Sequence, residues 1–425
     1  MRFLPLFQEK YALKSLFSGY ILSPATQKET MQMSTDKVNV GFIGAGCFIE
    51  AHHLPTAHET DFIKIRAIAD LNEKTLSARE KKYSPDYVTA DYHKLLDDPE
   101  TDLIVIGTRQ DTHAQLIVEA LDAGKWVWCE KPMCDTPEEE KMVIAAEKRA
   151  KGRLAIGFNR RFAPAVSKSM EVLRKLPRPW IVNYRLQTND YYKNKTNDTF
   201  YHDRAHIIYE GCHMLDLASF IFGETPERVF MSGTDDENEI VILEYNDGSR
   251  FLLTITSQAG APLLEKEMIE VFTKDGSISM RDFVDLRIRS IAGEKDHLFP
   301  PERCKYNPQI LRWGYSFYEI LRSRLVEPDA KISSGIVPVE AAFSEQPFTC
   351  ELEKIAEAEK DAPWQERNIF CDKGWHDAFC HFAKACMEKT EPHTASGVDG
   401  KLANDLGFAL LESKKQGIPL KFTQN

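Results

Sequence analysis

Residues 38–46 read VNVGFIGAG, and this stretch constrains the fold of the chain more than any other. An apolar run typical of a β-strand ends at a glycine-rich turn, and the residues after it have the character of a helix start. A strand–turn–helix brings unpaired backbone N–H groups and the positive end of a helix dipole to one point, which suits a pyrophosphate. Gly44 allows the tight turn and Gly46 lets phosphates approach the backbone. We therefore predict a dinucleotide site at Gly44, Gly46, Cys47 and Phe48.

The match to the pattern G-x-G-x-x-G/A is incomplete, because its third position is Ile49 rather than a small residue. Taken alone, the stretch is also compatible with a plain glycine turn. A second predicted strand, residues 62–70, ends on Asp70, roughly 20 residues past the glycines. A carboxylate there can hold both hydroxyls of an adenosine ribose and repels a 2′-phosphate, which favours NAD over NADP. The alternative is that Asp70 only caps the next helix.

Composition excludes several classes of partner. The chain has 425 residues, enough for two domains, and its hydrophobic content of 43% and charged content of 28% are ordinary for a globular protein. A net charge of −11 without a basic face argues against nucleic-acid binding. No run approaches the ~20 apolar residues that cross a bilayer. We expect a small-molecule substrate, and neither a nucleic acid nor a membrane as partner.

The nine cysteines form an odd number without a close C-x-x-C pair, and free thiols in a reducing cytoplasm are the simplest interpretation. Cys371, His376, Cys380 and His381 could suggest a metal site. Their spacing fits a helix with an aromatic face better, so we predict no metal.

Residues 1–36 are aromatic and mildly basic, and they lack the continuous apolar core and cleavage site of a secretory signal. A transit peptide, a short interfacial or packing helix, and an over-called start codon remain open for this N-terminal extension.

Residues 37–158 alternate strand and helix patterns, which predicts a doubly wound parallel sheet with its ligands at the carboxyl ends of the strands. The expected strands after the first two are 103–108, 126–129 and 153–158. Helices are expected at 112–123 and from Thr136, where a capping residue, a proline and an acid follow one another.

Residues 159–425 change in character and predict an α+β domain around a mostly antiparallel open sheet. Strands are expected at 182–186, 229–233, 240–245, 251–257, 268–273 and 277–280, and helices at 205–222, 309–325, 374–389 and 400–415. One face of this sheet should cover helices, and the other is apolar enough for a subunit interface, so a homo-oligomer is expected. Residues 293–372 look like an elaboration of this domain.

An ordered set of segments resembles a known family. Gly44-Ala45-Gly46, Thr108 with His113, Glu130-Lys131-Pro132, residues 157–162 (GFNRRF) and residues 211–216 (GCHMLD) occur in that order. Together they resemble the glucose–fructose oxidoreductase / inositol dehydrogenase / rhizopine catabolism (Gfo/Idh/MocA) family of NAD(P)-dependent sugar and polyol oxidoreductases, over roughly residues 38–290 and the final helix. The resemblance implies a Rossmann domain, NAD as cofactor and a substrate-binding second domain.

Oxidising a secondary alcohol needs a group that stabilises the oxygen and a group that takes its proton. Lys131, at the end of a predicted strand, can hydrogen-bond the substrate oxygen. His213 is the expected proton acceptor, because an imidazole titrates near neutral pH. Asp216 shares a helix face with His213 and could orient the ring or bind a substrate hydroxyl. Relatives often carry an acid or asparagine four residues before this histidine; here Tyr209 stands there, so either Glu210 takes the role or the dyad is absent.

Further cofactor contacts are expected from the ends of neighbouring strands and from the hinge between domains: Thr108, Arg109, His113, Glu130, Lys131, Asn159 and Arg160. Arg109 replaces a proline common in the family and could contact an acidic substrate or solvent. Candidate substrate contacts from the second domain are Tyr184, Asp190, Tyr191 and His202.

The resemblance implies an NAD-dependent dehydrogenase acting on a ring hydroxyl of a sugar, glycoside, sugar derivative or inositol. The alternative is a redox-neutral glycosidase that keeps its NAD, oxidises C3 transiently and eliminates the glycoside. A non-catalytic NAD-binding regulator is a third reading, which the presence of both the lysine and the histidine disfavours.

Overall fold

A computed structural model describes residues 37–187, 206–234, 238–256, 265–300, 307–326, 346–359 and 371–423. The expected N-terminal extension, residues 1–36, lies outside this range, as do Asp190, Tyr191 and His202. The described residues belong to one compact unit.

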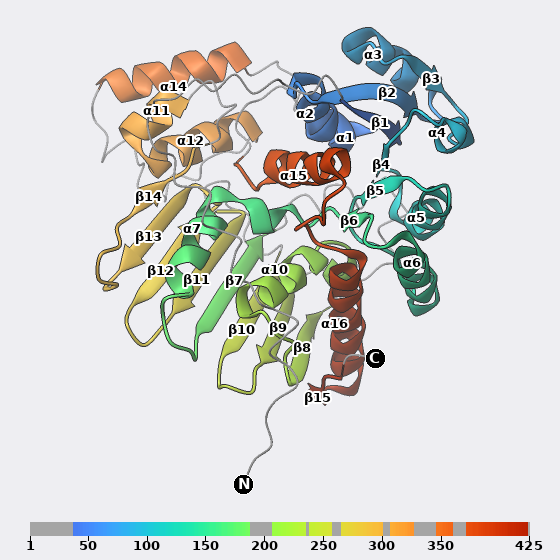
Figure 1. Ribbon diagram of the computed structural model, residues 1–425. Helices are drawn as coiled ribbons and strands as arrows, with labels where there is room; N and C mark the ends of the chain where they lie inside the picture. Colours follow the sequence, from blue (N-terminus) through green and yellow to red (C-terminus); the bar gives the residue numbers. More distant parts are fainter. Residues whose placement is uncertain are drawn as a thin grey trace. The chain divides into compact units, whose positions relative to one another are not determined.

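The first sheet is parallel throughout and has the strand order β3-β2-β1-β4-β5-β6. This order confirms the predicted doubly wound sheet. Figure 1 shows it in blue and green, with its strands at β1 Val38–Ile43, β2 Ile63–Ala69, β3 Tyr87–Thr89, β4 Leu103–Ile106, β5 Trp126–Cys129 and β6 Leu154–Ile156. Strand β4 is buried along its whole length, as a central parallel strand must be.

Helices cover both faces of this sheet, and one of them has the predicted capping signal. In helix α6, Pro137–Ala150, Thr136 and Glu139 form a capping box ahead of Pro137. The helices preceding α6 are α1 Cys47–Ala51, α2 His53–Glu59, α3 Glu73–Tyr83, α4 His93–Asp97 and α5 His113–Asp122.

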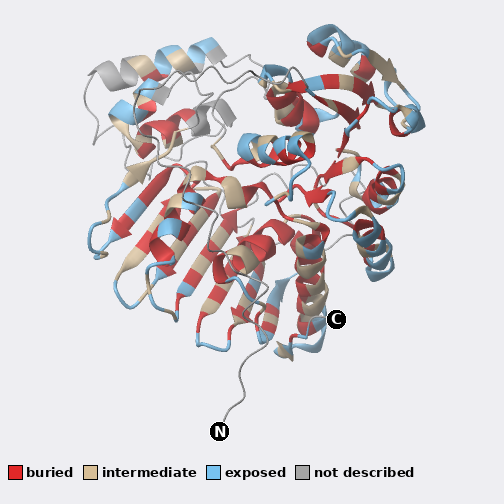
Figure 2. Cartoon of the chain, viewed as in Figure 1, coloured by how far each residue is buried: buried red, intermediate tan, exposed pale blue. Residues whose placement is uncertain are grey.

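The second sheet has nine strands in the order β14-β13-β12-β11-β7-β10-β9-β8-β15. Its neighbours pair antiparallel except β7 and β10, which are parallel. The strands are β7 Ile181–Gln187, β8 Arg228–Thr234, β9 Asn238–Glu244, β10 Arg250–Thr256, β11 Glu267–Phe272, β12 Ser277–Arg281, β13 Asp285–Arg289, β14 His297–Leu298 and β15 Leu420–Lys421. Figure 2 shows the alternation of buried and more exposed residues along them that the sequence predicts.

Two expected helices are interrupted, and glycine is the reason in both places. The predicted helix 205–222 is divided into α9 His206–Tyr209 and α10 Cys212–Phe222, with Glu210 and Gly211 between them. A Cβ atom on Gly211 would lie 2.6 Å from the carbonyl oxygen of Ile207, so the chain folds back more tightly there than another residue allows. The predicted helix 309–325 is divided into α11 Asn307–Trp313 and α12 Tyr315–Val326 at Gly314, whose φ is +79°.

One helix lies on a different sheet from the one expected. Helix α15, Trp375–Glu388, packs on the parallel sheet, where Phe379 and Phe382 join the core formed by β1, β2 and α2. On the nine-stranded sheet, one face carries α7 Pro164–Leu173, α10 and α16 Gly397–Gln416 (Figure 1). Helix α12 and helix α14, Gln346–Glu359, form a separate apolar cluster. The chain therefore returns to the first sheet through α15 just after the elaboration.

No helix in the described part of the chain is both long and apolar enough to cross a bilayer. Among the described residues, Cys47, Cys129, Cys134, Cys212, Cys371, Cys380 and Cys386 are free thiols. Cys380 lies 3.7 Å from His376 along α15, and His376 also contacts Asp377.

Candidate active site

The glycine turn after β1 has the backbone that the sequence predicts. Gly44 adopts φ +83°, and a Cβ atom there would lie 2.8 Å from the backbone of Gly107 at the end of β4. Gly46 precedes α1, and a Cβ atom on it would meet nothing within 4 Å. Cys47 and Phe48 begin α1 and are exposed. The turn therefore leaves open space in front of Gly46, as the approach of a phosphate requires.

Ile49, the departure from the glycine pattern, is accommodated by Gly107. Ile49 is fully buried, and a Cβ atom on Gly107 would lie 2.1 Å from its Cγ1 atom. The close packing of helix and sheet that the third glycine usually permits is obtained here from a glycine on the neighbouring strand. The incomplete motif is thus compensated within the fold.

Asp70 contacts the glycine turn directly. Its Oδ2 atom accepts a hydrogen bond from the backbone N–H of Ala45 at 2.8 Å, and its Oδ1 atom accepts one from Asn72 at 2.8 Å. Helix α3 is capped by Asn72, whose side chain accepts from Lys74 and Thr75. Capping of that helix is therefore the work of Asn72, and the Asp70 carboxylate is held at the edge of the turn.

Glu130 follows β5, and its carboxylate points to the interior. Its Oε1 atom lies 2.7 Å from Nε2 of the buried His53 and accepts a hydrogen bond from the indole of Trp128 at 3.2 Å. Burial acts to raise the pKa of Glu130, but the hydrogen bond and charge of His53 outweigh it and lower that pKa. The side chain joins β5 to α2.

Lys131 binds the break between α9 and α10. Its Nζ atom donates to the carbonyl oxygen of Tyr209 at 2.8 Å and to Oε2 of Glu210 at 2.9 Å. Burial acts to lower the pKa of Lys131, but the Glu210 carboxylate outweighs it and raises that pKa. Burial is likewise outweighed at Glu210, where Lys131, Lys266 and other cations hold the pKa well below its usual range. Both groups are therefore charged near neutral pH.

His213 lies one turn after this ion pair and is buried against Phe158, with ring centroids 5.9 Å apart. Its Nδ1 atom has no hydrogen-bond partner among the described residues. Burial, together with the positive charges of Arg160 and Lys131, lowers the pKa of His213 well below its usual value. The imidazole is thus neutral and able to accept a proton.

Asp216 shares the helix face of His213, but its oxygens bind Arg161 rather than the imidazole. The guanidinium donates to the two carboxylate oxygens at 2.9 and 2.5 Å, and also to Asp399 at 2.8 Å. Burial raises the pKa of Asp216 to about 7, although Arg161 opposes that shift. In place of the direct contact with the ring that the spacing suggested, Asp216 ties α10 to the turn that bears Arg161.

Arg160 and Asn159 lie in the 3₁₀ turn Asn159–Phe162 (η2), and both are buried. Arg160 donates to both oxygens of Glu267 at 2.8 and 2.9 Å, and its Nη2 atom lies 3.9 Å from Glu210. Asn159 donates to the carbonyl oxygen of Lys373 at 2.8 Å. Tyr184, a predicted substrate contact, is buried and donates to Glu267 instead.

The turn after β4 presents a mixture of exposed and occupied side chains. His113 is buried, with Nδ1 at 2.8 Å from the carbonyl oxygen of Pro132 and Nε2 at 3.3 Å from that of Thr108. Its ring therefore joins the turn to the segment after β5, and burial lowers its pKa. The Thr108 hydroxyl contacts Thr112, and Arg109 is exposed, 3.7 Å from Asp111.

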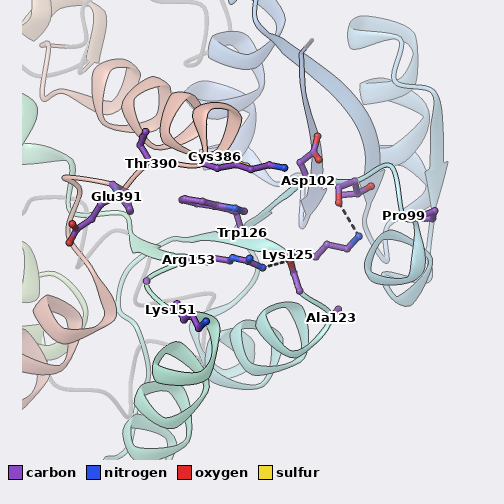
Figure 3. A pocket seen from close by; sticks show the side chains of 15 residues that line it. Pro99, Asp102, Ala123, Lys125, Trp126, Lys151, Arg153, Cys386, Thr390 and Glu391 are labelled. Carbon is purple, nitrogen blue, oxygen red and sulfur yellow. Dashed lines mark hydrogen bonds between the residues drawn. The ribbon is translucent and has the colours of Figure 1, made fainter.

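A cavity of about 860 Å³ lies at the opposite, amino end of the parallel strands. Figure 3 shows Trp126 at its centre, with Arg153 and Lys125 nearby. Lys125 donates to the carbonyl oxygens of Asp98 and Thr101, and Arg153 donates to that of Gly124. These cations satisfy backbone carbonyls, and none of the predicted site residues lines the cavity.

The first domain matches known proteins in sequence. Residues 38–158 match the model of an oxidoreductase family described as having an NAD-binding Rossmann fold, GFO_IDH_MocA. Over these residues the chain is similar to the Gfo/Idh/MocA family. The cofactor of this oxidoreductase is NAD, and its six-stranded sheet is the Rossmann domain.

Two curated relatives extend the match beyond that domain. An uncharacterised oxidoreductase, YrbE, of Bacillus subtilis is 27% identical over 66% of this chain and 86% of its own length. Myo-inositol 2-dehydrogenase of Thermotoga maritima is 27% identical over 57% of this chain and 74% of its own length.

Among solved structures, the WlbA dehydrogenase of Bordetella pertussis, in complex with NADH and UDP-GlcNAcA, superposes with a TM-score of 0.63. It shares 16% identity and covers 92% of this chain and 100% of its own. The likeness supports the fold.

Sequence reasoning did not identify Arg161, Glu267, Lys373 or Asp399, which surround the predicted residues. Arg161 stands beside Arg160 in the GFNRRF segment, and that doubled arginine is the local signal that would have drawn attention to buried carboxylate partners. Glu267 and Lys373 carry no comparable signal, because their contacts join segments more than 100 residues apart.

Proposed function

We propose that the protein is an NAD-dependent dehydrogenase of a secondary ring hydroxyl in a sugar, glycoside, sugar derivative or inositol. One observation carries the proposal: the ammonium of Lys131, the carboxylate of Glu210 and the unpartnered Nδ1 atom of His213 gather at the carboxyl end of β5. Ligands of doubly wound folds bind at that edge. The inositol dehydrogenase among the relatives supports the substrate class.

Lys131 is suited to polarise the substrate oxygen. An ammonium has three N–H donors, and the described residues occupy two of them, through Tyr209 and Glu210. The third donor can hydrogen-bond the hydroxyl and stabilise the negative charge that develops on its oxygen. Glu210 holds the ammonium in place. We propose this as the role of the acid that stands one position after Tyr209.

His213 is suited to take the hydroxyl proton. The bound nicotinamide supplies the acceptor for the hydride, so the protein must supply the acceptor for the proton. The neutral imidazole has a free ring nitrogen, and the neighbouring cations of Lys131 and Arg160 disfavour its resting protonation. Asp216 contributes through Arg161, by fixing α10 on which His213 stands.

The glycine turn and Asp70 fit NAD. Open space in front of Gly46 admits the pyrophosphate, and each Asp70 oxygen, which accepts one backbone hydrogen bond, retains a lone pair for a ribose hydroxyl. Thr108, Arg109, His113, Glu130, Asn159 and Arg160 stay predicted contacts of the cofactor half of the site; of these, Thr108 and Arg109 have the more accessible side chains.

Absorbance at 340 nm tests the proposal. Purified protein is incubated with NAD and a panel of inositols, free sugars and glycosides, and growth of the band with one member identifies the substrate class. Lys131→Ala should abolish this turnover while NAD binding, measured by calorimetry, stays within several-fold. A flat trace with release of an aglycone would instead indicate the redox-neutral glycosidase, and loss of NAD binding in Lys131→Ala would make the lysine a cofactor ligand.

We also propose that the face of the nine-stranded sheet opposite the helices pairs with a second copy of the chain. Phe230, Ile242 and Leu252 lie in register across β8, β9 and β10, and Ile240 beside them is 48% exposed. Exposed apolar surface of this kind marks interfaces. Light scattering coupled to size exclusion should give a dimer or tetramer, and Ile240→Glu should reduce the mass; a monomer in both cases would contradict the proposal.

A further inference from the structure

Lys373, two residues before α15, reaches into the candidate site from the C-terminal part of the chain. Lys373 is 7% exposed, and its Nζ atom binds Oε1 of Glu267, the carboxylate that also accepts both donors of Arg160. Arg160 is in turn 3.9 Å from Glu210, which binds Lys131. Five charged side chains from five separate segments thus form a continuous chain that ends at the proposed reacting group.

The backbone fixes Lys373 as firmly as the side chain does. Its carbonyl oxygen accepts a hydrogen bond from Asn159 at 2.8 Å. The next residue, Gly374, has φ +83° and approaches η2 so closely that a Cβ atom would lie 2.5 Å from the backbone of Phe162 and Ala163. Arg160 and Lys373 are therefore held in one assembly and converge on Glu267 from two sides.

The net charge of this cluster depends on Lys373. Lys131, Arg160 and Lys373 contribute three positive charges, and Glu210 and Glu267 contribute two negative ones. Without Lys373, Arg160 alone would neutralise Glu267, and less of its field would reach Glu210. Buried charges interact strongly over such distances because little water screens them.

We propose that Lys373 is a positioning residue for the active site, acting through Glu267 and Arg160 to set the field and the orientation of the Lys131–Glu210 pair. The proposal rests on the proposed role of Lys131. It means that the segment before α15 influences the chemistry at the carboxyl end of β5.

The proposal predicts the sign of the change at Lys131. Besides Glu210, the titratable and charged groups near Lys131 are Arg160, Cys212, Glu130, His113 and His213; those near Glu210 also include Lys266. All of these stay in place when Lys373 is changed to methionine. The local field then becomes more negative by one charge, which favours the ammonium form of Lys131.

Competitive labelling of lysines with acetic anhydride measures this form without substrate or NAD. Trypsin yields one peptide, residues 126–141, in which Lys131 precedes proline and is not cleaved. At pH 9.5 we expect the labelling rate of Lys131 in Lys373→Met to fall on the order of tenfold, because a smaller fraction of the amine is then unprotonated and reactive. Lys373→Arg should restore the rate, because it keeps the charge.

Glu267→Gln supplies the opposite sign. Removing that carboxylate makes the field at Lys131 more positive, so the labelling rate should rise above that of the unchanged protein. Lys401→Met is the matched control: Lys401 is also partly buried and ion-paired, with Glu140 and Asp405 rather than with any member of this cluster, and its loss should leave Lys131 labelling unchanged.

Equal labelling in Lys373→Met and the unchanged protein, with native circular dichroism, would overturn the proposal and leave Lys373 a structural ion pair. If Lys373→Met does not fold, Glu267→Gln decides by the same measurement. Where a substrate is found, kcat/KM of Lys373→Met should fall on the order of 10- to 100-fold and be restored in Lys373→Arg. Failure of the 340 nm assay alone would contradict the proposed function without touching the labelling result.

Discussion

The Nζ atom of Lys131 lies 2.9 Å from Oε2 of Glu210, although the two residues are separated by 79 positions in the sequence. The contact joins the carboxyl end of β5 to the break between α9 and α10. The break falls at Glu210 and Gly211, where the close approach of Gly211 to Ile207 leaves no room for a Cβ atom, and the Glu210 side chain contacts the lysine there. Glu210, an acid one position after the place where relatives often carry one, thus forms its ion pair with Lys131.

The Glu210–Lys131 contact can be tested by Glu210→Gln, which keeps the shape and removes the charge. The pKa of Lys131 should fall, because burial and Arg160 then act without the opposing carboxylate, and the pKa of His213 should fall as well. We expect kcat/KM to decrease on the order of 10- to 100-fold and its acid limb to move to lower pH.

Glu210→Asp is the control for that experiment, since it retains the charge at a shorter reach and should keep the position of the acid limb. A lowered melting temperature with an unmoved pH profile in Glu210→Gln would show that the ion pair serves folding only.

Much of the fold could be predicted because short segments of the sequence determine it. The long apolar strands and the capping box at Thr136 each depend on residues within one segment. Short or less apolar elements were missed for the same reason: β3 has three half-buried residues, and β13 alternates arginines with its apolar positions. Helix breaks at Gly211 and Gly314 were missed because helical periodicity continues across both.

The site was predictable where the chain itself supplies the geometry, as at the glycine turn and at Lys131. It was not predictable where partners come from distant segments. The sequence around Arg160 gives no sign of its contact with Glu267, and the sequence around Glu267 gives no sign of its contact with Lys373. Both contacts form only when the two sheets and α15 pack together. Placement of α15 on the parallel sheet likewise depends on contacts of Phe379 and Phe382 with Trp128, which is about 250 residues away in the sequence.

The pairing of Ile49 with Gly107 predicts a strong coupling between the two positions. Gly107→Ala places a Cβ atom 2.1 Å from Ile49 Cγ1 and should lower the free energy of unfolding by about 1–3 kcal/mol. In the double variant Gly107→Ala with Ile49→Ala, the new methyl group fills part of the space that Ile49 vacates. The loss should therefore be smaller than the sum of the single losses.

Chemical denaturation of the NAD-free protein measures all three variants. Gly46→Ala is the matched control, because Gly46 has φ −68° and no atom would lie within 4 Å of the new Cβ, so its unfolding free energy should not change. Strict additivity of the two substitutions would contradict the compensation.

Removing the Asp70 carboxylate tests the choice of cofactor. Asp70→Ala should weaken NAD binding about 10- to 100-fold, the loss expected for hydrogen bonds to a charged group. It should also reduce the ratio of NAD affinity to NADP affinity. Calorimetric titration with both dinucleotides measures the two effects. Glu73→Ala removes a neighbouring exposed acid from α3 and should change neither affinity. Unchanged NAD affinity in Asp70→Ala would make the carboxylate a brace for Ala45 alone.

Asp216 predicts how stability depends on pH. Its pKa is raised to about 7 in the folded protein, above the ordinary value of 3.8 for an aspartate, so the folded state binds more protons than the unfolded state between those values. Stability must then fall as pH rises through that window and level off above about pH 7. Asp216→Asn cannot ionise and should lose this contribution, while its amide oxygen can still accept a hydrogen bond from Arg161.

The melting temperatures of both proteins, measured from pH 5.5 to 8, give the test. Asp216→Asn should gain relative to the unchanged protein as the pH rises, with most of the gain below pH 7. The comparison isolates Asp216, because the carboxylates with lowered pKa values, such as Glu210, Glu267 and Asp399, are ionised in both proteins throughout that range. A constant difference would mean that Arg161 holds Asp216 ionised at all these pH values, and that burial does not dominate at this site.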